Sequence, residues 1–290
     1  MSTTINSDKY VGVGKRFIIP PANVACPAFV STAAQTYWNA LTAANGGVEI
    51  NGSLYGITTC ALKAAIDNWF IAALPTISGK VYLHIGGTQA THALNAVNPS
   101  VNSLNFSSGV TYTAQGSVFN GASYADTGIV PGVDFSSGSF HVSAKTLSAG
   151  NGTLIGCRDS ASVSTDKVDL LYTSPNLRVD MYTTSPAPCI GTSRVNVAAS
   201  ANAFSLAQRD NNNLYLYQNG TQIGTVTGAY CGTLPITARI FIGALNSANT
   251  SQLQYFTGTM AFNSIGKTFS SGALATFTAA TNTLMSILGR

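Results

Sequence analysis

Carboxylates are the first side chains to consider, because paired carboxylates carry out general acid, base and nucleophilic chemistry on glycosides. The chain has ten, nine aspartates and the single glutamate Glu49. Retaining glycosidases hold two carboxyl groups about 5 Å apart. The closest spacing in this sequence, Asp166 and Asp169, puts the two side chains on opposite faces of a strand. We therefore expect no catalytic residues and no enzyme, unless a pair that includes Asp169 or Asp180 forms across strands.

The three histidines offer little further chemistry. His84 lies inside an apolar run, His92 follows a glycine loop, and His141 falls on the expected solvent-facing side of a strand. Their spacing is not that of zinc ligands. A serine, a histidine and an aspartate can form a triad from distant parts of a chain, so the sequence leaves that arrangement open. No Gly-x-Ser-x-Gly segment favours it.

Tyrosines on expected strands are the candidates for carbohydrate binding. Saccharide sites stack the sugar ring on an aromatic face and surround it with polar side chains. Tyr215 and Tyr217 share one face of their strand, while Tyr172 and Tyr182 lie on other segments. The alternative is that these residues are simply favourable strand formers. All four are kept as candidate carbohydrate-binding residues.

Charged residues are unusually scarce. They make up 8% of the 290 residues, against roughly 25% in an ordinary soluble domain. The net charge is +4, and of the basic residues only Lys15 and Arg16 are adjacent. Because nucleic-acid binders cluster Lys and Arg along one face, we expect no nucleic-acid partner. No run reaches the ~18 apolar residues of a membrane span, and residues 1–9 lack a signal-peptide pattern, so we expect no membrane partner either.

Low charge with abundant Ser, Thr, Asn and Gly is typical of proteins that live in assemblies, where much of the surface is shared with neighbours. We therefore expect a homo-oligomer. The cysteines are odd in number and lack a Cys-x-x-Cys spacing, so we expect free thiols packed as small hydrophobic residues in a reducing compartment. They are Cys26, Cys60, Cys157, Cys189 and Cys231.

The elements that must position these residues begin with an arm that contains two helices. Residues 1–30 carry turn residues without a period, which favours an extended segment. Ser31 is a suitable cap for a helix that runs to Ala44, and Thr58 for a second helix with an apolar stripe. We take residues 1–78 as an N-terminal arm and helical anchor. Its stripe has no expected partner in the rest of the chain, which makes the arm a candidate for building the oligomer.

After the arm the pattern changes to short strands and tight turns. Apolar and polar residues alternate at 140–145, the period of a strand with one solvent-facing side. Asn219 and Gly220 separate two strand-forming runs, the strongest local signal for a hairpin. Further strands are expected at 81–85, 176–181, 239–244 and 254–265. The pattern predicts a mainly β, antiparallel two-sheet sandwich over 79–290, closed by a helix that Ser270 caps.

Several of these runs resemble a known family. The hairpin LYLYQNGTQIGTV, the strands RIFIGALN and FTGTMAFNSIG, and a last helix ending LGR resemble the end of concanavalin-A-like and laminin-G-like domains in tailed-bacteriophage virion proteins. The segment YADTG at 124–128 resembles the entry strand of such domains. The resemblance covers residues 95–290.

The resemblance implies a concanavalin-A-like jelly-roll sandwich in a phage virion assembled in the host cytoplasm. Its partners would be other capsid or tail proteins, with the arm as anchor and the lectin-like sandwich serving shell reinforcement or adhesion to a host-surface glycan. The alternatives are a polysaccharide-degrading virion enzyme and a free lectin-like binding protein. Glucanases of this fold use Glu-x-Asp-x-Glu on one strand, and this chain has only Glu49.

Laminin-G-like domains also often bind one calcium through an aspartate and carbonyl oxygens at the rim of the sandwich. Of the available aspartates, Asp159, Asp166 and Asp210, the last is the most ligand-like because three asparagines follow it. The competing interpretation is an ordinary turn, since Asp and Asn are common turn residues. A structural calcium at Asp210 is therefore a candidate, and we expect no other cofactor.

Overall fold

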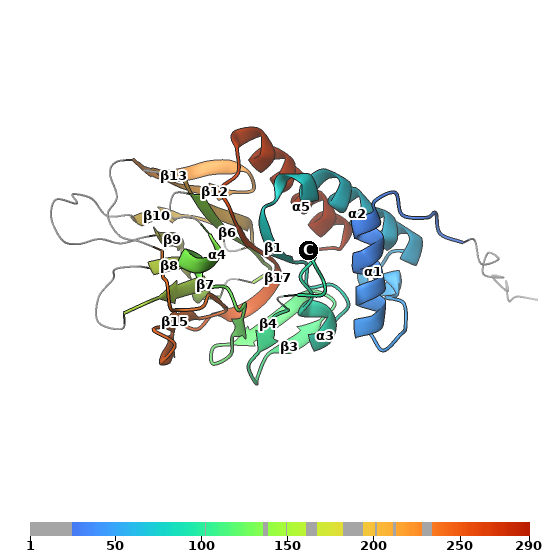
Figure 1. The fold of residues 1–290 in the computed structure, drawn as a ribbon, viewed down its shortest axis with the longest axis horizontal. Helices are drawn as coiled ribbons and strands as arrows, with labels where there is room; N and C mark the ends of the chain where they lie inside the picture. The colour runs from blue at the N-terminus through green and yellow to red at the C-terminus, as the bar shows by residue number, and fades with distance from the viewer. Residues whose placement is uncertain are drawn as a thin grey trace, which may run out of the picture.

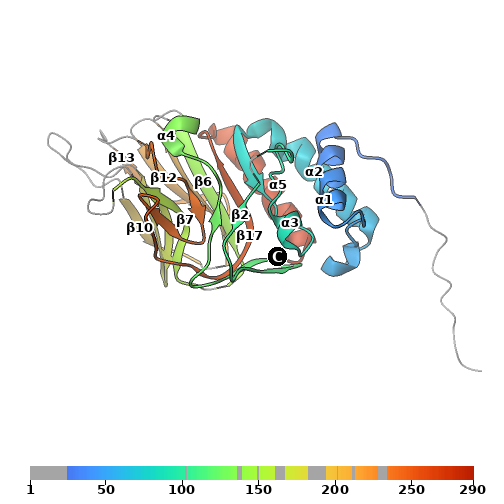
Figure 2. The ribbon, with the colours of Figure 1, turned by 60° about the horizontal axis from the view of Figure 1, so that its bottom comes forward.

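The protein is built from three layers, one of helices and two of β-strands (Figures 1 and 2). The computed structural model describes residues 25–101, 103–135, 139–148, 150–160, 167–181, 194–200, 202–210, 213–227 and 234–290. Helices α1 (Thr32–Ala44), α2 (Thr59–Ala73) and α5 (Ser271–Ile287) lie on one side of the first sheet. The second sheet lies on the other side of the first, so the layer order decides which surfaces stay open.

Eight strands of the described residues make the first sheet, in the order β13-β12-β11-β6-β17-β4-β3, with β1 also paired to β17. Its strand pairings are antiparallel. The strands are β1 (Gly79–Tyr82), β3 (Thr111–Thr113), β4 (Gly116–Asn120), β6 (Ser139–Thr146), β11 (Phe204–Asp210), β12 (Asn213–Gln218), β13 (Thr221–Thr227) and β17 (Thr257–Gly266).

Nine described strands make the second sheet, in the order β10-β9-β8-β7-β14-β5-β2, with β15 beside β7 and β16 beside β15. The β15–β7 pair is parallel and the others are antiparallel. The strands are β2 (Asn105–Phe106), β5 (Ala125–Asp126), β7 (Gly152–Arg158), β8 (Lys167–Thr173), β9 (Asn176–Met181), β10 (Arg194–Ala198), β14 (Phe241–Ile242), β15 (Leu245–Ser247) and β16 (Ser251–Leu253). The predicted antiparallel two-sheet sandwich is confirmed.

Short helical segments complete the chain. They are η2 (Gly52–Tyr55), η3 (Leu74–Thr76), α3 (Gln89–His92) and α4 (Pro131–Asp134). No helix of the described segments is long and apolar enough to cross a membrane.

The long helices and the hairpin begin where the sequence predicts. Ser31, Thr58 and Ser270 each accept a hydrogen bond from the N–H three residues further on, which satisfies a donor that the helix itself leaves free. Asn219 and Gly220 have φ values of 50° and 86°, and they join β12 to its antiparallel partner β13. These features are local, so a few residues of sequence suffice to predict them.

Two predicted strands are shorter in the structure. The strand expected at 81–85 is β1, which ends at Tyr82, because His84 adopts a φ of 47° that lies outside the strand region. The strand expected at 239–244 is reduced to β14, and Gly243, with a φ of 83°, ends it.

Two hydrophobic cores lie on the two sides of the first sheet. Strand β17 serves both, because Met260 and Ile265 face the second sheet while Phe262 faces the helices. Phe277 of α5 lies with its ring centroid 5.9 Å from that of Phe262. Trp69 of α2 lies 6.4 Å from Phe262, also between ring centroids.

The helical layer therefore closes on itself and on the first sheet. Trp69 Nε1 donates a hydrogen bond to Thr281 Oγ1 of α5 at 3.2 Å. The apolar stripe of α2 has its partner inside the chain, in α5 and the first sheet. The expectation that this stripe lacks a partner is wrong. The stripe is therefore no longer a reason to expect that the arm builds an oligomer.

The helix-facing side of β6 is buried rather than solvent-facing, which corrects the expectation from its alternation. His141 and Ser143 have no exposed surface, and the His141 ring lies 6.5 Å from Phe277 of α5. His141 Nδ1 donates to the carbonyl of Lys267 at 2.6 Å, and Nε2 accepts from Ser264 at 2.9 Å. Burial lowers the pKa of His141 to about 4.

A second buried cluster joins two histidines to a serine and an asparagine. His92 Nε2 accepts the N–H of Gly87 at 3.1 Å, so its neutral ring donates from Nδ1 to Ser117 Oγ at 2.9 Å. Ser117 then donates to His84 Nδ1 at 2.9 Å, and His84 Nε2 donates to Asn263 Oδ1 at 2.8 Å. This order matches a nucleophile, a base and an orienting group. All four side chains are fully buried, however, so Ser117 is out of reach of solvent.

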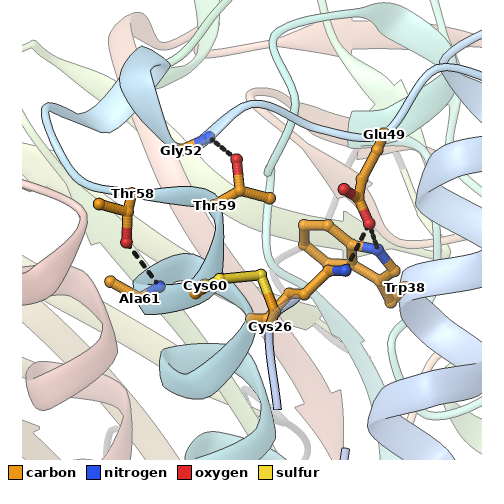
Figure 3. Close-up of a disulfide and its surroundings, with 9 residues drawn as sticks. Cys26, Trp38, Glu49, Gly52, Thr58, Thr59, Cys60 and Ala61 are labelled. Atoms are coloured by element: carbon orange, nitrogen blue, oxygen red, sulfur yellow. Dashed lines mark hydrogen bonds and ion pairs between the residues drawn. A yellow bond between two sulfur atoms is a disulfide. The ribbon is translucent and has the colours of Figure 1, made fainter. Parts of the chain in front are cut away.

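One disulfide ties the start of the described chain to α2 (Figure 3). Cys26 is bonded to Cys60, which lies in the first turn of α2. The expectation of free thiols is wrong for this pair, because a sequence separation of 34 residues gave no sign that the chain returns there. Cys157 is free and buried, as expected. Cys189 and Cys231 lie outside the described residues.

Arg290 fastens the last helix to the first sheet. Its guanidinium donates to the carbonyls of Leu83 at 3.2 Å, His84 at 3.0 Å, and Ala114. It also lies 5.3 Å from the ring centroid of Tyr55, within cation–π range. One side chain thus joins the end of β1, the β3–β4 turn and η2.

Acid should destabilise the protein from about pH 6.5 downward through its buried histidines. An unfolded histidine binds a proton near pH 6.5, whereas burial lowers the pKa of His84 and of His141 to about 4 in the folded chain. Their stabilising effect is therefore complete above pH 6.5. It is lost by up to about 1.4 kcal/mol per pH unit for each histidine as the pH falls toward 4.

Urea unfolding at a series of pH values measures this dependence. His141→Gln retains a donor and an acceptor, and it should show a shallower loss of stability between pH 6.5 and 4 than the wild type. Ser143→Ala changes the neighbouring side chain without removing a titrating group, so it should keep the wild-type slope. If stability fell equally steeply with pH in all three proteins, His141 would not be a source of the acid dependence.

Candidate functional site

The outer face of the second sheet is the side of the molecule that the long helices leave uncovered. Helices α1, α2 and α5 lie on the far side of the molecule from β7–β10 (Figures 1 and 2). The sequence has fourteen basic and ten acidic residues, 24 in all. Six of them occupy outward positions on these four strands, namely Arg158, Lys167, Asp169, Arg178, Asp180 and Arg194. Charge that is scarce in the chain is concentrated on this face.

Two of these residues are the cross-strand carboxylate pair that the sequence left open. Asp169 of β8 and Asp180 of β9 are direct partners in the antiparallel register and share a face. Both side chains are 0% exposed. Asp169 lies four residues before Thr173, and Asp180 lies four residues after Asn176, the partner of Thr173. The turn between β8 and β9 was visible in the sequence, so counting outward from it would have found the pair.

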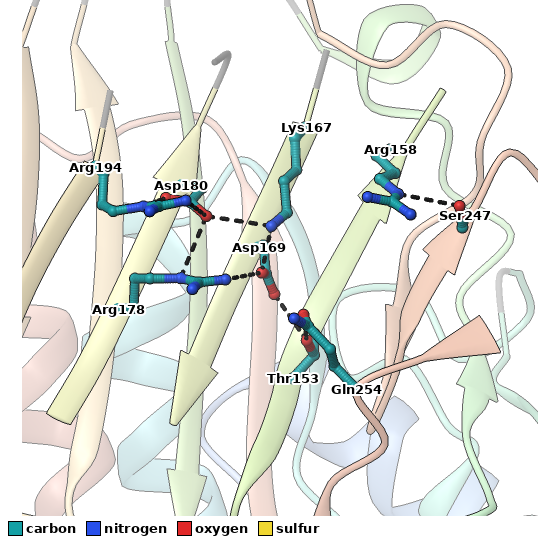
Figure 4. Close-up of polar contacts among 9 residues, drawn as sticks. All are labelled: Thr153, Arg158, Lys167, Asp169, Arg178, Asp180, Arg194, Ser247 and Gln254. Atoms are coloured by element: carbon teal, nitrogen blue, oxygen red, sulfur yellow. Dashed lines mark hydrogen bonds and ion pairs between the residues drawn. The ribbon is translucent and has the colours of Figure 1, made fainter. Parts of the chain in front are cut away.

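Three cations neutralise the carboxylates (Figure 4). Lys167 Nζ lies 2.7 Å from Asp169 Oδ2 and 3.2 Å from Asp180 Oδ2. Arg194 of β10 forms a fork on Asp180, with Nε 2.6 Å from Oδ1 and Nη2 3.1 Å from Oδ2. Arg178 reaches both carboxylates, at 3.5 Å to Asp169 and 3.3 Å to Asp180. We call these five residues the ion lattice.

The ion lattice holds Asp180 in its ionised form. Burial by itself raises the pKa of Asp180, but the hydrogen bond from Arg194 and the charges of Lys167, Arg178 and Arg194 outweigh it, so the pKa is lowered. The same hydrogen bond raises the pKa of Arg194. A general acid needs a carboxyl group with a raised pKa, and a nucleophile must be reachable. Neither carboxylate is exposed, so the pair is arranged to hold charge and to fix the side chains around it.

Strand β7 shapes the other side of the lattice. Thr153 Oγ1 donates to Asp169 Oδ1 at 2.9 Å. Gly156 faces Asp169 across the ladder, where a Cβ would lie 3.2 Å from Asp169 Oδ1 and 2.8 Å from Thr153 Cγ2. A glycine leaves the room that the carboxylate needs. At the end of the strand, Arg158 Nε donates to Ser247 Oγ at 3.0 Å.

Two of the four candidate tyrosines lie together on the opposite side of the sandwich. Tyr215 and Tyr217 of β12 face the helix side of the first sheet, with ring centroids 6.2 Å apart. Both are partly exposed, and we call them the tyrosine strip. Gln208 lies opposite Tyr215 on β11 and hydrogen-bonds to Tyr217, whose pKa burial raises.

The other two candidates are not part of the strip. Tyr172 packs in the core between the sheets at 6% exposure, and its hydroxyl donates to the carbonyl of Ala199 at 3.5 Å. Tyr182 lies outside the described residues. Tyr172 and Tyr215 follow the same alternating pattern in sequence. The Tyr172 ring lies between the two sheets, whereas the Tyr215 ring lies partly exposed on the helix side of the first sheet.

The aspartates considered for calcium lie in different settings. Asp210 is exposed at the end of β11, and in the part of the chain that the structure describes no group of three His, Cys, Asp or Glu side chains gathers around it or elsewhere. Asp159 accepts the N–H groups of Ile236 at 2.6 Å and Ala238 at 2.7 Å, so its carboxylate already holds a loop. Asp166 lies outside the described residues. Calcium at Asp210 stays a prediction.

No family model matches this sequence, and no curated protein matches it. Among solved structures, domain 4 of the extracellular arabinanase AbnA from Geobacillus stearothermophilus, in complex with arabinotriose, is similar at TM-score 0.48 and 15% identity, over 70% of this chain and 99% of that domain. The CBM40 of the Ruminococcus gnavus IT-sialidase, bound to α2,3-sialyllactose, is similar at TM-score 0.39 and 18% identity, over 49% of this chain and 81% of that one. The Streptococcus pneumoniae sialidase NanB is similar at TM-score 0.44 and 15% identity, over 55% of this chain and 26% of that one. The architecture of this chain rests on its own strand pairings.

Asp180→Asn should destabilise the protein strongly, because it removes a charge that three cations share. Breaking a fully buried ion pair costs about 3–5 kcal/mol, and we expect about 2–3 kcal/mol here because Arg194 is partly exposed. The folded pKa of Asp180 is lowered, so its stabilising effect is present above about pH 3.9 and is lost as the pH falls through the folded value. The variant should lack this part of the acid dependence.

Chemical unfolding of Asp180→Asn at pH 7 and below pH 4 tests both statements. Asp210→Asn is the matched control, because Asp210 is exposed at the end of its strand and should lose little stability. If the two variants lost the same stability at pH 7, the lattice would not be the stabilising unit that its geometry indicates.

Proposed function

We propose that this chain is a saccharide-binding protein without catalytic activity, and that it holds the saccharide on the tyrosine strip. The observation that carries the proposal is the pair of partly exposed rings, 6.2 Å apart on one strand. An aromatic ring covers the apolar face of a sugar, and neighbouring amides bond its hydroxyls. Gln222 and Thr225 of β13 are exposed and pair with Tyr217 and Tyr215, so they supply an amide and a hydroxyl beside the rings.

The strip is held rigidly, which favours binding. Leu214 and Leu216 alternate with the two tyrosines and are fully buried between the sheets. Strand β12 has neighbours on both sides, β11 and β13. Rings fixed in this way lose little conformational freedom when a ligand stacks on them.

The proposal of binding without turnover is supported by the state of the groups that are able to catalyse. Asp169 and Asp180 are buried and ion-paired, and Ser117 is buried with its histidines. Glu49 is bound to Lys63 Nζ at 2.5 Å and accepts the Trp38 Nε1–H at 3.1 Å. Each of these groups already has a structural partner.

For the setting of this activity we propose the virion of a tailed phage, in which residues 1–78 attach to the capsid or tail and the sandwich is displayed. The support is the resemblance of the hairpin at 214–226 and of the strand at 256–266 to virion proteins. A homo-oligomer fits such a particle. The Cys26–Cys60 disulfide agrees with a protein that works outside a reducing cytoplasm.

Affinity electrophoresis against soluble neutral polysaccharides, such as dextran, arabinan and galactomannan, tests the binding site. At least one should retard the wild type. Tyr215→Ala and Tyr217→Ala should each weaken that binding by about 1–2 kcal/mol, the scale of one lost stacked ring. Tyr172→Phe, whose ring is in the core, should bind as the wild type does.

Either of two results would end the proposal for this strip. One is the lack of retardation by every polysaccharide in the panel, and the other is unchanged binding by both alanine variants. Reducing ends are measured in the same mixtures. Release that continues with time and disappears in Asp169→Asn would show an enzyme instead.

Mass spectrometry of purified phage particles tests the setting. We expect peptides of this chain in particles, at a copy number that is a multiple of the symmetry of the capsid or tail structure that holds it. Its absence from washed particles, together with its presence in the soluble fraction of the lysate, would contradict the virion and favour a free lectin-like protein.

A further inference from the structure

The ion lattice carries more positive charge than it needs. Lys167, Arg178 and Arg194 face two carboxylates, Asp169 and Asp180, which leaves one net positive charge. Arg158 extends the cationic surface onto β7, where it pairs in register with Lys167. Figure 4 shows these four cations on adjacent strands of one face. The lattice therefore presents one positive charge that its own carboxylates do not neutralise.

Hydrogen-bond donors are in excess as well. One lysine offers three donors and each arginine offers five, which is about thirteen donors for two carboxylates. Arg178 is bonded most weakly, because its Nη2 lies 3.5 Å from Asp169 and its Nε, 3.3 Å from Asp180, lacks hydrogen-bond geometry. The Arg194 side chain is 44% exposed and the Arg178 side chain is 24% exposed, so both reach solvent, although Arg178 Nε itself is buried. Among the described residues, these donors outnumber the acceptors that they contact.

We propose that this face is a second binding site, and that its ligand is an acidic saccharide whose carboxylate is held by Arg178 and Arg194. The two arginines are diagonal neighbours on β9 and β10, since Arg194 pairs with Asp180 and Arg178 with Asn196. A guanidinium matches a carboxylate with two parallel hydrogen bonds, which an ammonium does not. The buried aspartates hold both arginines in place before the ligand arrives.

The polar surroundings of the cations favour a saccharide over a nucleic acid. Gln254 is exposed and lies beside Thr153 at the lattice edge, where it offers an acceptor, whereas Ser247 is buried and accepts from Arg158. A sugar acid brings one charge per residue together with hydroxyl donors for such acceptors. A nucleic-acid strand brings a charge at every phosphate, and the two aspartates interleaved with the cations disfavour a dense anion. This site and the tyrosine strip would both bind saccharides, but they lie on different sheets, so either one can exist without the other.

Binding to polygalacturonate and to its methyl ester, measured by calorimetry on the full chain, tests the site. We expect the wild type to bind the free acid and not the ester. Arg178→Gln should weaken binding tenfold or more, and it is the mildest variant because Lys167 and Arg194 still neutralise Asp180. Arg194→Lys, which keeps the charge but not the fork, should weaken binding as well. Lys145→Gln removes a charge from the first sheet and should change nothing.

Several results would overturn the inference. Equal binding of the methyl ester would exclude a carboxylate, and preference for dextran sulfate would assign the anion to sulfate. Tighter binding of duplex DNA would indicate a phosphate site, and an equal loss in Lys145→Gln would indicate general electrostatic attraction. Tyr217→Ala should leave polygalacturonate binding intact. If Tyr217→Ala abolished it while Arg178→Gln did not, the second site would fail and the tyrosine strip would stand.

Discussion

Burial of the first sheet on both faces is the constraint on which the rest of this structure depends. Its strands send alternate side chains into two cores, one against the second sheet and one against the helices. A polar group on such a strand has no access to water, so it must find a partner within the protein. His141 on β6 hydrogen-bonds to Ser264, and His84, two residues after the end of β1, hydrogen-bonds to Ser117 and Asn263. The histidines are therefore satisfied members of a polar core layer rather than free catalytic groups.

The same constraint decides where binding can take place. With the helices on one side, the described residues leave partly exposed a stretch of β12 and the arginine side chains on the outer face of the second sheet. On that face two carboxylates lie directly opposite each other, an arrangement that repulsion would disfavour without Lys167, Arg178 and Arg194. A slip of one residue in strand register would separate these charges, so the ion lattice also helps to fix the register of β8, β9 and β10.

Contacts between distant segments hold the helical layer together and fasten it to the first sheet. The carboxylate of Asp67 accepts the N–H groups of Val30 and Ser31, each at 2.8 Å, next to the Cys26–Cys60 disulfide. Arg290 bonds carbonyls at the far end of the first sheet. Asp67 and the disulfide join α2 to the segment before α1 within the helical layer, whereas Arg290 joins this layer to the first sheet. The helices that cover the first sheet are thereby kept in one position.

The sequence by itself determined the features whose causes are local. The caps at Ser31 and Ser270 and the hairpin at Asn219–Gly220 depend on a few neighbouring residues, and period-two alternation identified the sandwich. Only the tertiary structure decided what covers each face, because alternation separates two sides of a strand without saying what lies against them. It placed His141 beneath a helix, Tyr172 in the core, and Asp169 beside Asp180. The candidate sites were therefore identified by residue type in the sequence, whereas their accessibility and partners depend on contacts between residues far apart in the chain.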